Sequence, residues 1–300
     1  MLPPNKAMVK IKNILCPVDF SEFSAKAFDY AYSLARRYDA KLYLQHAIRP
    51  LTEYAYHVPP AWAQQYYADS RVESQEALQK LIVKQASNGF RPEALVQVGF
   101  PAETILDFAQ KQPIDLIVMG THGLQGVDRW MMGSVTEKVI RKAGCPVLAV
   151  RKPIHDFVAP KETDDPVQLH KILLATDFSD YGQRAFAYAI SLAMEYNAEL
   201  TLLHVLEDIP HDEELSSATT RLIHELEAPV PPDARNWCTI KSTVRIGKPY
   251  QEIIQLALDS HTDLIVLGVR GRSRPDLALF GSTTYRVLQL GSSPVLAVHV

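Results

Sequence analysis

The sequence predicts an α/β protein of two tandem doubly wound domains, each a five-stranded parallel sheet with helices on both faces. Two observations support this class. Strand-like and helix-like segments alternate regularly, which is typical of parallel sheets with crossover helices. The 300 residues also contain an internal duplication, and each copy has a common domain size of about 100–150 residues. We expect a first domain at 1–152, a linker at 153–168 and a second domain at 169–300.

The duplication is clearest in a spacing of glycines that occurs twice. A Gly-x-x-Gly sequence is followed after nine residues by Gly-Ser in both copies, and four identical residues at the same spacing in both copies are hard to obtain by chance. Asp19 matches Asp177 at an offset of 158 residues, whereas Gly120 matches Gly268 at an offset of 148. The first copy therefore holds ten extra residues, which we place between its second strand and Val98. The repeated loop residues are Gly120, Gly123, Gly133 and Ser134 in the first copy, and Gly268, Gly271, Gly281 and Ser282 in the second.

The elements of the first copy follow from their residue patterns. Apolar, β-rich runs predict strands, and apolar residues that recur at helical spacing, as from Phe28 to Tyr38, predict helices. Ser21 and Ser179 stand where helix N-caps belong. The prolines and mixed charge of 151–169 predict a linker. The predicted strands are 11–18, 41–47, 94–98, 116–119 and 146–150, and the predicted helices are 21–38, 69–87, 102–111 and 134–142.

Composition excludes several classes of protein. A net charge of −3 and a pI near 6.4 give no electrostatic footprint for nucleic acid or for an anionic membrane. The first residues lack the apolar segment of a signal peptide, and no run approaches the roughly 20 apolar residues of a membrane span. Three scattered cysteines predict neither a disulfide framework nor a metal cluster. We therefore expect a cytoplasmic protein without nucleic-acid or membrane partners.

The glycine loops have the chemistry of a phosphate site. Each follows an apolar strand and precedes a helix, so backbone N–H groups and the positive helix end point toward one spot. Asp19 and Asp177 also follow strands, and ligands of doubly wound sheets bind outside the carboxyl ends of strands. We expect each aspartate and its loop to converge on one crevice per domain. The alternative is that the aspartates only complement a helix dipole and that the glycines serve turn geometry.

These motifs together resemble the universal stress protein family, in its ATP-binding branch. The resemblance rests on the Pro17-Val18-Asp19-Phe20-Ser21 segment, Gly99-Phe100-Pro101, the glycine loops and Cys145-Pro146-Val147-Leu148-Ala149-Val150. It implies the strand order 3-2-1-4-5, a bound ATP, ADP or AMP with Mg²⁺, and final strands that pair the halves as an internal pseudo-dimer, with a homodimer possible in principle. The residues it implies at the nucleotide are Pro17, Asp19, Ala47, Gly120, Gly123, Gly133, Ser134, Thr176, Asp177, Val205, Gly268, Gly271, Arg272, Gly281 and Ser282.

The two loops differ in charge. Arg270, Arg272 and Arg274 surround the second loop, whereas Leu124 stands at the position of Arg272 in the first. Because arginine offers fixed bidentate donors to phosphate, we expect unequal sites with the second binding the more charged nucleotide better. The alternative is that each arginine is a solvated loop charge.

Three functional classes remain open from the sequence. The first is a nucleotide-binding stress or regulatory sensor, the second a slow ATP-hydrolysing enzyme, and the third an interaction scaffold that has lost its ligand. We assign no catalytic residue and no metal ligand, although Asp19, Asp177, Asp128 and Asp276 are candidates for the second class. His46 and His204 are interpreted as hydrogen-bonded histidines at strand ends. The aromatic group Tyr54, Tyr56, Trp62, Tyr66 and Tyr67 is interpreted as packing over the core of its own domain.

Overall fold

The structure is a computed structural model that describes residues 9–51, 59–85, 90–122, 132–151, 156–158, 166–207, 214–269 and 281–299. The chain forms two compact units. The N-terminal unit comprises Ile11–Val150 with Val158–Val167, and the C-terminal unit comprises Gln168–Val300 with Met1–Lys10 and Arg151–Phe157. The exact bounds of the domains and of the linker at 153–168 remain predictions, because most of that linker lies outside the described residues.

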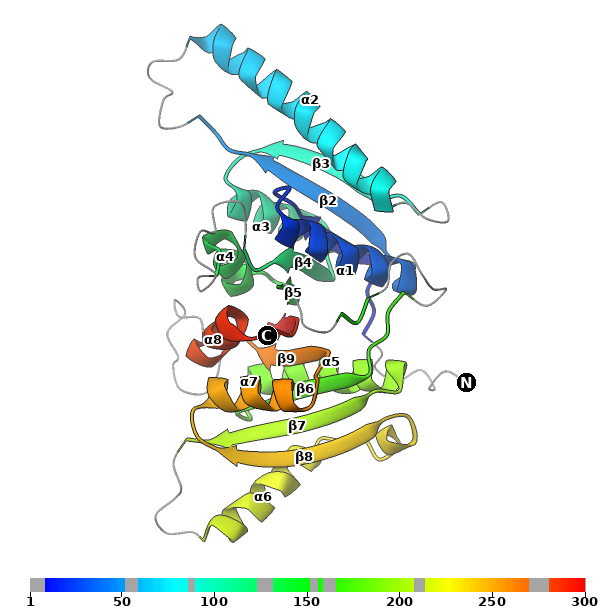
Figure 1. Ribbon diagram of the computed structural model, residues 1–300, viewed down its shortest axis with the longest axis vertical. Coiled ribbons are helices and arrows are strands. Elements are labelled where there is room, and N and C mark those ends of the chain that lie inside the picture. Colours follow the sequence, from blue (N-terminus) through cyan, green and yellow to red (C-terminus); the bar gives the residue numbers. More distant parts are fainter. Residues whose placement is uncertain are drawn as a thin grey trace. The chain divides into compact units, whose positions relative to one another are not determined.

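The N-terminal unit is a parallel five-stranded sheet with the strand order β3-β2-β1-β4-β5 (Figure 1). Its register sets Ile14 of β1 beside Leu42 of β2 and Leu116 of β4. The predicted order 3-2-1-4-5 is confirmed. The elements are β1 (Asn13–Pro17), α1 (Glu22–Tyr38), β2 (Lys41–Ile48), α2 (Pro60–Gln85), β3 (Glu93–Val98), α3 (Pro101–Lys111), β4 (Leu116–Gly120), α4 (Ser134–Lys142) and β5 (Val147–Val150).

The C-terminal unit repeats this topology with the order β8-β7-β6-β9-β10. The pairs β7–β8, β6–β7, β6–β9 and β9–β10 are parallel, and Ile172 of β6 lies beside Leu200 of β7 and Leu264 of β9. Its elements are β6 (Lys171–Ala175), α5 (Asp180–Tyr196), β7 (Glu199–Leu206), α6 (Leu215–Glu227), the short 3-10 helix η1 (Ala234–Asn236), β8 (Thr239–Ile246), α7 (Pro249–Asp259), β9 (Leu264–Gly268), α8 (Ser282–Leu290) and β10 (Val295–Val298).

The central strands form the core of each unit. Ile14, Leu15 and Ile117 are fully buried in the N-terminal unit, as are Leu173 and Ile265 in the C-terminal unit. Strands that are covered on both faces consist of continuous apolar runs, because neither face meets water. This is why short uninterrupted runs of Ile, Leu and Val were sufficient to predict these strands.

The first helix of each unit begins and ends at specific residues. Ser21 is the N-cap of α1, and its hydroxyl accepts a hydrogen bond from the Ser24 N–H at 3.2 Å. Ser179 caps α5 in the same way. Both helices end at a residue in the left-handed region, Asp39 with φ 49° and Asn197 with φ 52°, as is common for helix C-termini. The two predicted N-caps are confirmed.

The predicted bounds of α2 were wrong. The helix begins at Pro60 rather than at residue 69, and its 26 residues are twice the 13 of α6. The early part was missed because its residues have no clear apolar face at helical spacing. Trp62 is 54% exposed and stacks on Tyr66 with 5.7 Å between ring centroids, so packing over the core is also wrong for Trp62. Tyr54 and Tyr56 lie outside the described residues.

Three short segments belong to a different compact unit from a neighbouring part of the chain. Met1–Lys10 and Arg151–Phe157 belong to the C-terminal unit, and Val158–Val167 belongs to the N-terminal unit. We call these the crossed segments. The Val9 N–H donates to the Ser191 hydroxyl at 2.7 Å, within the C-terminal unit. In the same unit, Arg151 donates from Nη1 to the carbonyl oxygens of Gln289 and Gly291 at 2.7 and 3.4 Å, at the end of α8. Burial lowers the pKa of this arginine. Val158 and Val167, which form an antiparallel bridge, belong to the N-terminal unit.

Among the residues that the structure describes, no helix has both the length and the apolar character needed to cross a membrane. Cys16 and Cys238 are buried, and Cys145 is partly buried. All three thiols are free, and burial raises the pKa of each.

Candidate functional site

The candidate site of each unit lies where the strand order reverses. In the N-terminal unit β1 pairs with both β2 and β4. The strand order therefore continues to β2 and β3 on one side of β1 and to β4 and β5 on the other. Asp19 follows β1, and Gly120 ends the neighbouring β4. In the C-terminal unit Asp177 and Gly268 hold the same positions on β6 and β9. Each aspartate therefore shares one sheet edge with the start of its glycine loop, which is where doubly wound sheets bind ligands.

The aspartates organise the turn from strand to helix. Asp19 Oδ1 accepts hydrogen bonds from the backbone N–H of Ser21 at 3.0 Å and from its hydroxyl at 2.6 Å. Asp177 accepts the corresponding bonds from Ser179 at 3.1 and 2.6 Å. Because the serine hydroxyl also caps the helix, the carboxylate, the turn and the helix start form one hydrogen-bonded unit. Both aspartates are thereby held in a defined orientation at the strand end.

An aromatic residue in a costly backbone conformation follows each aspartate. Phe20 has φ 65° and Phe178 has φ 61°, in the left-handed region that side chains other than glycine rarely adopt. Such a conformation costs about 1–3 kcal/mol and persists only where its surroundings enforce it. The repeated Asp-Phe-Ser sequence was the only signal of this feature, and sequence reasoning missed it.

The strand-end histidines support this turn. His46 donates from Nδ1 to the Val18 carbonyl oxygen at 2.8 Å, and its ring lies 4.5 Å from that of Phe20 between centroids. His204 makes the same contacts with the Thr176 carbonyl oxygen, at 2.9 Å, and with the Phe178 ring, at 4.7 Å. The prediction that both histidines are hydrogen-bonded is confirmed. Each one fixes the backbone just before the aspartate and packs against the aromatic ring just after it.

The first loop glycines have a packing reason to be glycine. A Cβ atom on Gly120 would lie 2.9 Å from the carbonyl carbon of Phe23, and one on Gly268 would lie 2.8 Å from that of Tyr181. The helix after the aspartate, α1 or α5, passes very close to the end of the neighbouring strand in the sheet, β4 or β9. Only a residue without a side chain fits there. Close packing alone thus accounts for glycine at these two positions.

The two ends of each glycine loop are tied together. Thr136 of α4 donates its hydroxyl to the Gly120 carbonyl oxygen at 2.8 Å, and the Gly133 N–H donates to the Thr121 carbonyl oxygen at 2.8 Å. In the C-terminal unit, Thr284 donates to the Gly268 carbonyl oxygen at 2.9 Å. These bonds hold the N-terminus of the helix at the strand end, next to the aspartate turn.

The helix after each loop begins without a side-chain cap. Gly133 is the N-cap of α4 and Gly281 that of α8, and neither helix start has a side-chain cap hydrogen bond. The first N–H groups of a helix need acceptors, and an anion can supply them with the help of the helix dipole. Ser134 and Ser282 are the first residues of these two helices.

The two helix starts differ in charge. The first turn of α4 contains Glu137, whereas that of α8 contains no acidic residue and has Tyr285 at the corresponding position. A carboxylate in the first turn uses the same positive potential that would attract a bound anion. This difference favours anion binding in the C-terminal unit. It has the same direction as the predicted arginine effect and is independent of it.

The other predicted residues are only partly described. Pro17 ends β1, and Ala47 and Val205 lie half-buried near the ends of β2 and β7. Thr176 follows β6, and its hydroxyl accepts the Phe178 N–H at 3.0 Å. Within the described ranges, no group of three or more His, Cys, Asp or Glu side chains could hold a metal ion. Gly123, Leu124, Asp128, Arg270, Gly271, Arg272, Arg274 and Asp276 lie outside the described residues.

The comparisons with known proteins agree with this architecture. The model of the universal stress protein family matches residues 10–151 and again residues 168–299. The chain belongs to the universal stress protein family. Universal stress protein MJ0531 of Methanocaldococcus jannaschii is 36% identical over 142 residues, which cover 47% of this chain and 83% of that protein. That relative therefore corresponds to one half of a tandem chain.

A solved structure has a similar fold over nearly the whole chain. A universal stress protein from Archaeoglobus fulgidus matches over 96% of this chain and 98% of its own, with a TM-score of 0.71 at 21% identity. Another universal stress protein, solved in complex with cAMP, is 26% identical and covers 46% of this chain and 95% of its own, with a TM-score of 0.33. The first likeness describes the fold, and the complex with cAMP is a property of the second protein.

Proposed function

We propose that this universal stress protein binds an adenine nucleotide in at least one of its units and acts as a regulatory sensor. One observation carries the proposal: in both units a fixed aspartate turn shares a sheet edge with a helix N-terminus that has no side-chain cap. A carboxylate can accept hydrogen bonds from the hydroxyl or amino groups of a nucleoside, and a helix start can hold its phosphates. The two groups therefore suit the two ends of one nucleotide.

In this proposal, Asp19 and Asp177 contact the nucleoside, and Ala47 and Val205 lie beside the base. Ser134 and Ser282, with the N–H groups of their helix turns, hold the phosphates. Gly123, Gly271 and Arg272 complete the loops as proposed from the sequence. Mg²⁺ accompanies ATP or ADP as the counterion of the phosphates, and the protein acts in the cytoplasm with its halves as an internal pseudo-dimer.

Calorimetry with ATP, ADP and AMP in the presence of Mg²⁺ tests the proposal, together with mass spectrometry of small molecules released from the denatured protein. We expect binding of at least one nucleotide. Absence of all three from both measurements would refute the nucleotide site and favour an interaction scaffold.

A turnover assay separates a sensor from an enzyme. Dedicated phosphoryl-transfer kinases turn over at roughly 1–100 s⁻¹, and a sensor should fall far below that range. A rate within it that Asp19→Asn or Asp177→Asn abolishes, without loss of nucleotide binding, would make the protein an ATP-hydrolysing enzyme.

A further inference from the structure

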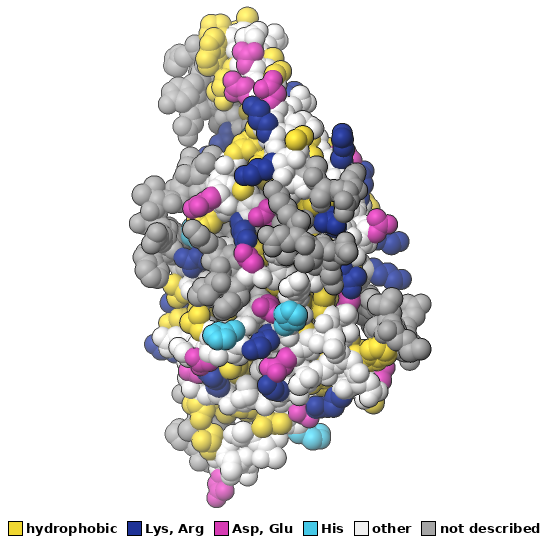
Figure 2. Space-filling model, turned by 45° about the vertical axis from the view of Figure 1, so that its right-hand side comes forward, with side chains coloured by type: hydrophobic (Ala, Val, Ile, Leu, Met, Phe, Trp, Pro, Cys, Tyr) yellow, Lys and Arg dark blue, Asp and Glu magenta, His cyan; other side chains and the backbone are white. Residues whose placement is uncertain are grey.

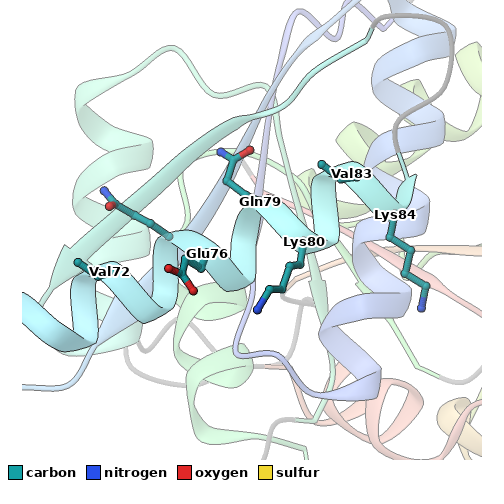
Figure 3. Close-up of a pocket in the computed structure, with 7 residues that line it drawn as sticks. Val72, Glu76, Gln79, Lys80, Val83 and Lys84 are labelled. Atoms are coloured by element: carbon teal, nitrogen blue, oxygen red, sulfur yellow. The ribbon is translucent and has the colours of Figure 1, made fainter.

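The outward face of α2 lies apart from the candidate site of the N-terminal unit. Leu78 and Ile82 are buried on the inner side of the helix, where α2 packs on β2 and β3. On the outer side Val72 is 55% and Val83 is 72% exposed. In the N-terminal unit, α2 is the outermost element beside β3 (Figure 1). A shallow groove follows the outer side, lined by Val72, Gln75, Glu76, Gln79, Lys80, Val83 and Lys84 (Figure 3).

The residues along this groove have the spacing of a helix–helix contact. Val72, Glu76, Gln79 and Val83 follow one another at intervals of four, three and four residues, which is the spacing of a coiled-coil seam. We call these four residues the α2 seam. The intervals read the same in both directions along the helix. A seam with this property can match a second copy of itself that runs the opposite way.

We propose that the α2 seam binds the α2 seam of a second copy of this chain in an antiparallel, two-fold symmetric pair. In this pairing Val72 lies against Val83 of the second copy at each end of the contact. Glu76 lies against Gln79 of the second copy in the middle, where the amide can donate to the carboxylate. A parallel pair would instead set Glu76 against Glu76, and like charges at a contact are unfavourable.

Charge on the flanks of the seam selects the same orientation. The exposed charges that flank the seam are acidic before the midpoint of the seam, at Glu73 and Glu76, and basic after that midpoint, at Lys80 and Lys84. Figure 3 shows Glu76, Lys80 and Lys84 along one side of the helix (Figure 3). An antiparallel partner places Glu73 beside Lys80 of the second copy, twice per pair because of the two-fold axis. Complementary charge of this kind identifies a second copy of the chain as the occupant.

Among the described residues, the seam lies in the N-terminal unit. The corresponding helix of the C-terminal unit, α6, has half the length of α2. The contact therefore follows from the extra residues of the first copy rather than from the shared fold. Figure 2 shows hydrophobic side chains next to charged ones of both signs on the described surface, so exposed apolar residues alone would not single out α2 (Figure 2).

Sedimentation of the full chain over a range of concentrations tests the pair, with charge reversal as the decisive variable. Glu73→Lys and Lys80→Glu should each weaken dimerisation about tenfold, because each places two like-charge pairs at the contact. The double variant should return to within about twofold of the parent, since the pairing is restored with its signs exchanged. Arg221→Glu on α6 is the matched control and should leave dimerisation unchanged.

Cross-linking tests the register. A mixture of Val72→Cys and Val83→Cys proteins should form an interchain disulfide under mild oxidation, and Val72→Cys alone should form much less. A chain that stays monomeric at all concentrations, or a dimer that responds equally to the α2 variants and to Arg221→Glu, would overturn the proposal. A disulfide that forms best between two copies of Val72→Cys would overturn the antiparallel arrangement.

Discussion

Asp19 Oδ1 lies 2.6 Å from the hydroxyl oxygen of Ser21 and 3.0 Å from its backbone nitrogen, so one carboxylate oxygen holds both groups. The same relationship joins Asp177 to Ser179. Each aspartate thus has a structural task that is independent of any ligand. Substitutions at this position must separate the role in the turn from the proposed contact with a nucleotide. The turn needs a hydrogen-bond acceptor, whereas the proposed contact depends on the negative charge.

Asp19→Asn and Asp19→Ala should therefore have different effects. The asparagine retains an acceptor oxygen, so we expect a loss of less than about 1 kcal/mol in the free energy of unfolding, against about 1–2 kcal/mol for alanine. If the carboxylate contacts the nucleoside, both variants should weaken nucleotide binding by about tenfold. Urea unfolding and calorimetry measure the two quantities. Equal instability of both variants would show that the turn requires the charge.

Gly120→Ala should destabilise the N-terminal unit by about 1–3 kcal/mol, because its Cβ would overlap the backbone of α1 at Phe23. Gly268→Ala should do the same in the C-terminal unit, at Tyr181. Gly144→Ala is the matched control, since nothing lies within 4 Å of its Cβ position. Thermal or urea unfolding provides the comparison. A Gly120→Ala protein as stable as the control would show that α1 can move away from the strand end.

Glu137→Gln should change stability and binding in opposite directions. Loss of a carboxylate from the first turn of α4 removes a favourable dipole interaction of about 0.3–1 kcal/mol. The same loss should raise the affinity of the N-terminal unit for ATP by about two- to fivefold. The phosphates then no longer compete with the carboxylate for the positive potential at the N-terminus of α4. Tyr285→Glu should weaken ATP binding in the C-terminal unit. Calorimetry that finds no change in either variant would show that phosphates do not bind at these helix starts.

Cys145 makes stability sensitive to alkaline pH. Burial, with a smaller effect from Asp115, raises the pKa of this thiol to about 12, whereas an unfolded thiol titrates near 8.5. The contribution of the protonated Cys145 thiol to the free energy of unfolding is fully present below pH 8.5. It is lost as the pH rises toward 12, because only the unfolded chain then releases the proton. The parent should lose up to about 1.4 kcal/mol more per pH unit than Cys145→Ala in this window. Parallel slopes in urea unfolding between pH 9 and 10.5 would refute this.

Arg151→Met should destabilise the C-terminal unit by about 1–2 kcal/mol. The arginine donates to two carbonyl oxygens at the end of α8, which otherwise lack intrahelical partners, and the methionine keeps the length of the chain but not the donors. Lysine at this position should restore part of the loss, since it can donate to one carbonyl oxygen. Urea unfolding followed by amide exchange in 282–290 locates the effect. Unchanged exchange there would show that α8 ends without this cap.

The sequence was sufficient for features that repeat or that depend on local chemistry. Apolar runs predicted the buried strands, and Ser21 and Ser179 predicted the helix starts, because caps act within a few residues. The aspartates and Gly120 were predicted together at the strand ends from the fold class. The start of α2 was missed, because an outer helix can expose Trp62 and needs no complete apolar face. The reason for glycine at Gly120 was also missed, since it depends on a tertiary contact with α1.

The crossed segments have a consequence for the history of the chain. A duplicated gene can in principle be divided again into two genes, provided that each product keeps what it needs to fold. Here Arg151, which caps α8, and Val9, which bonds Ser191, belong to the C-terminal unit but come before its main segment, Gln168–Val300, in sequence. Val158 and Val167, which belong with the N-terminal unit, follow Arg151. A single cut at any point leaves at least one product without a segment that it uses, so the fusion of the two copies is hard to reverse.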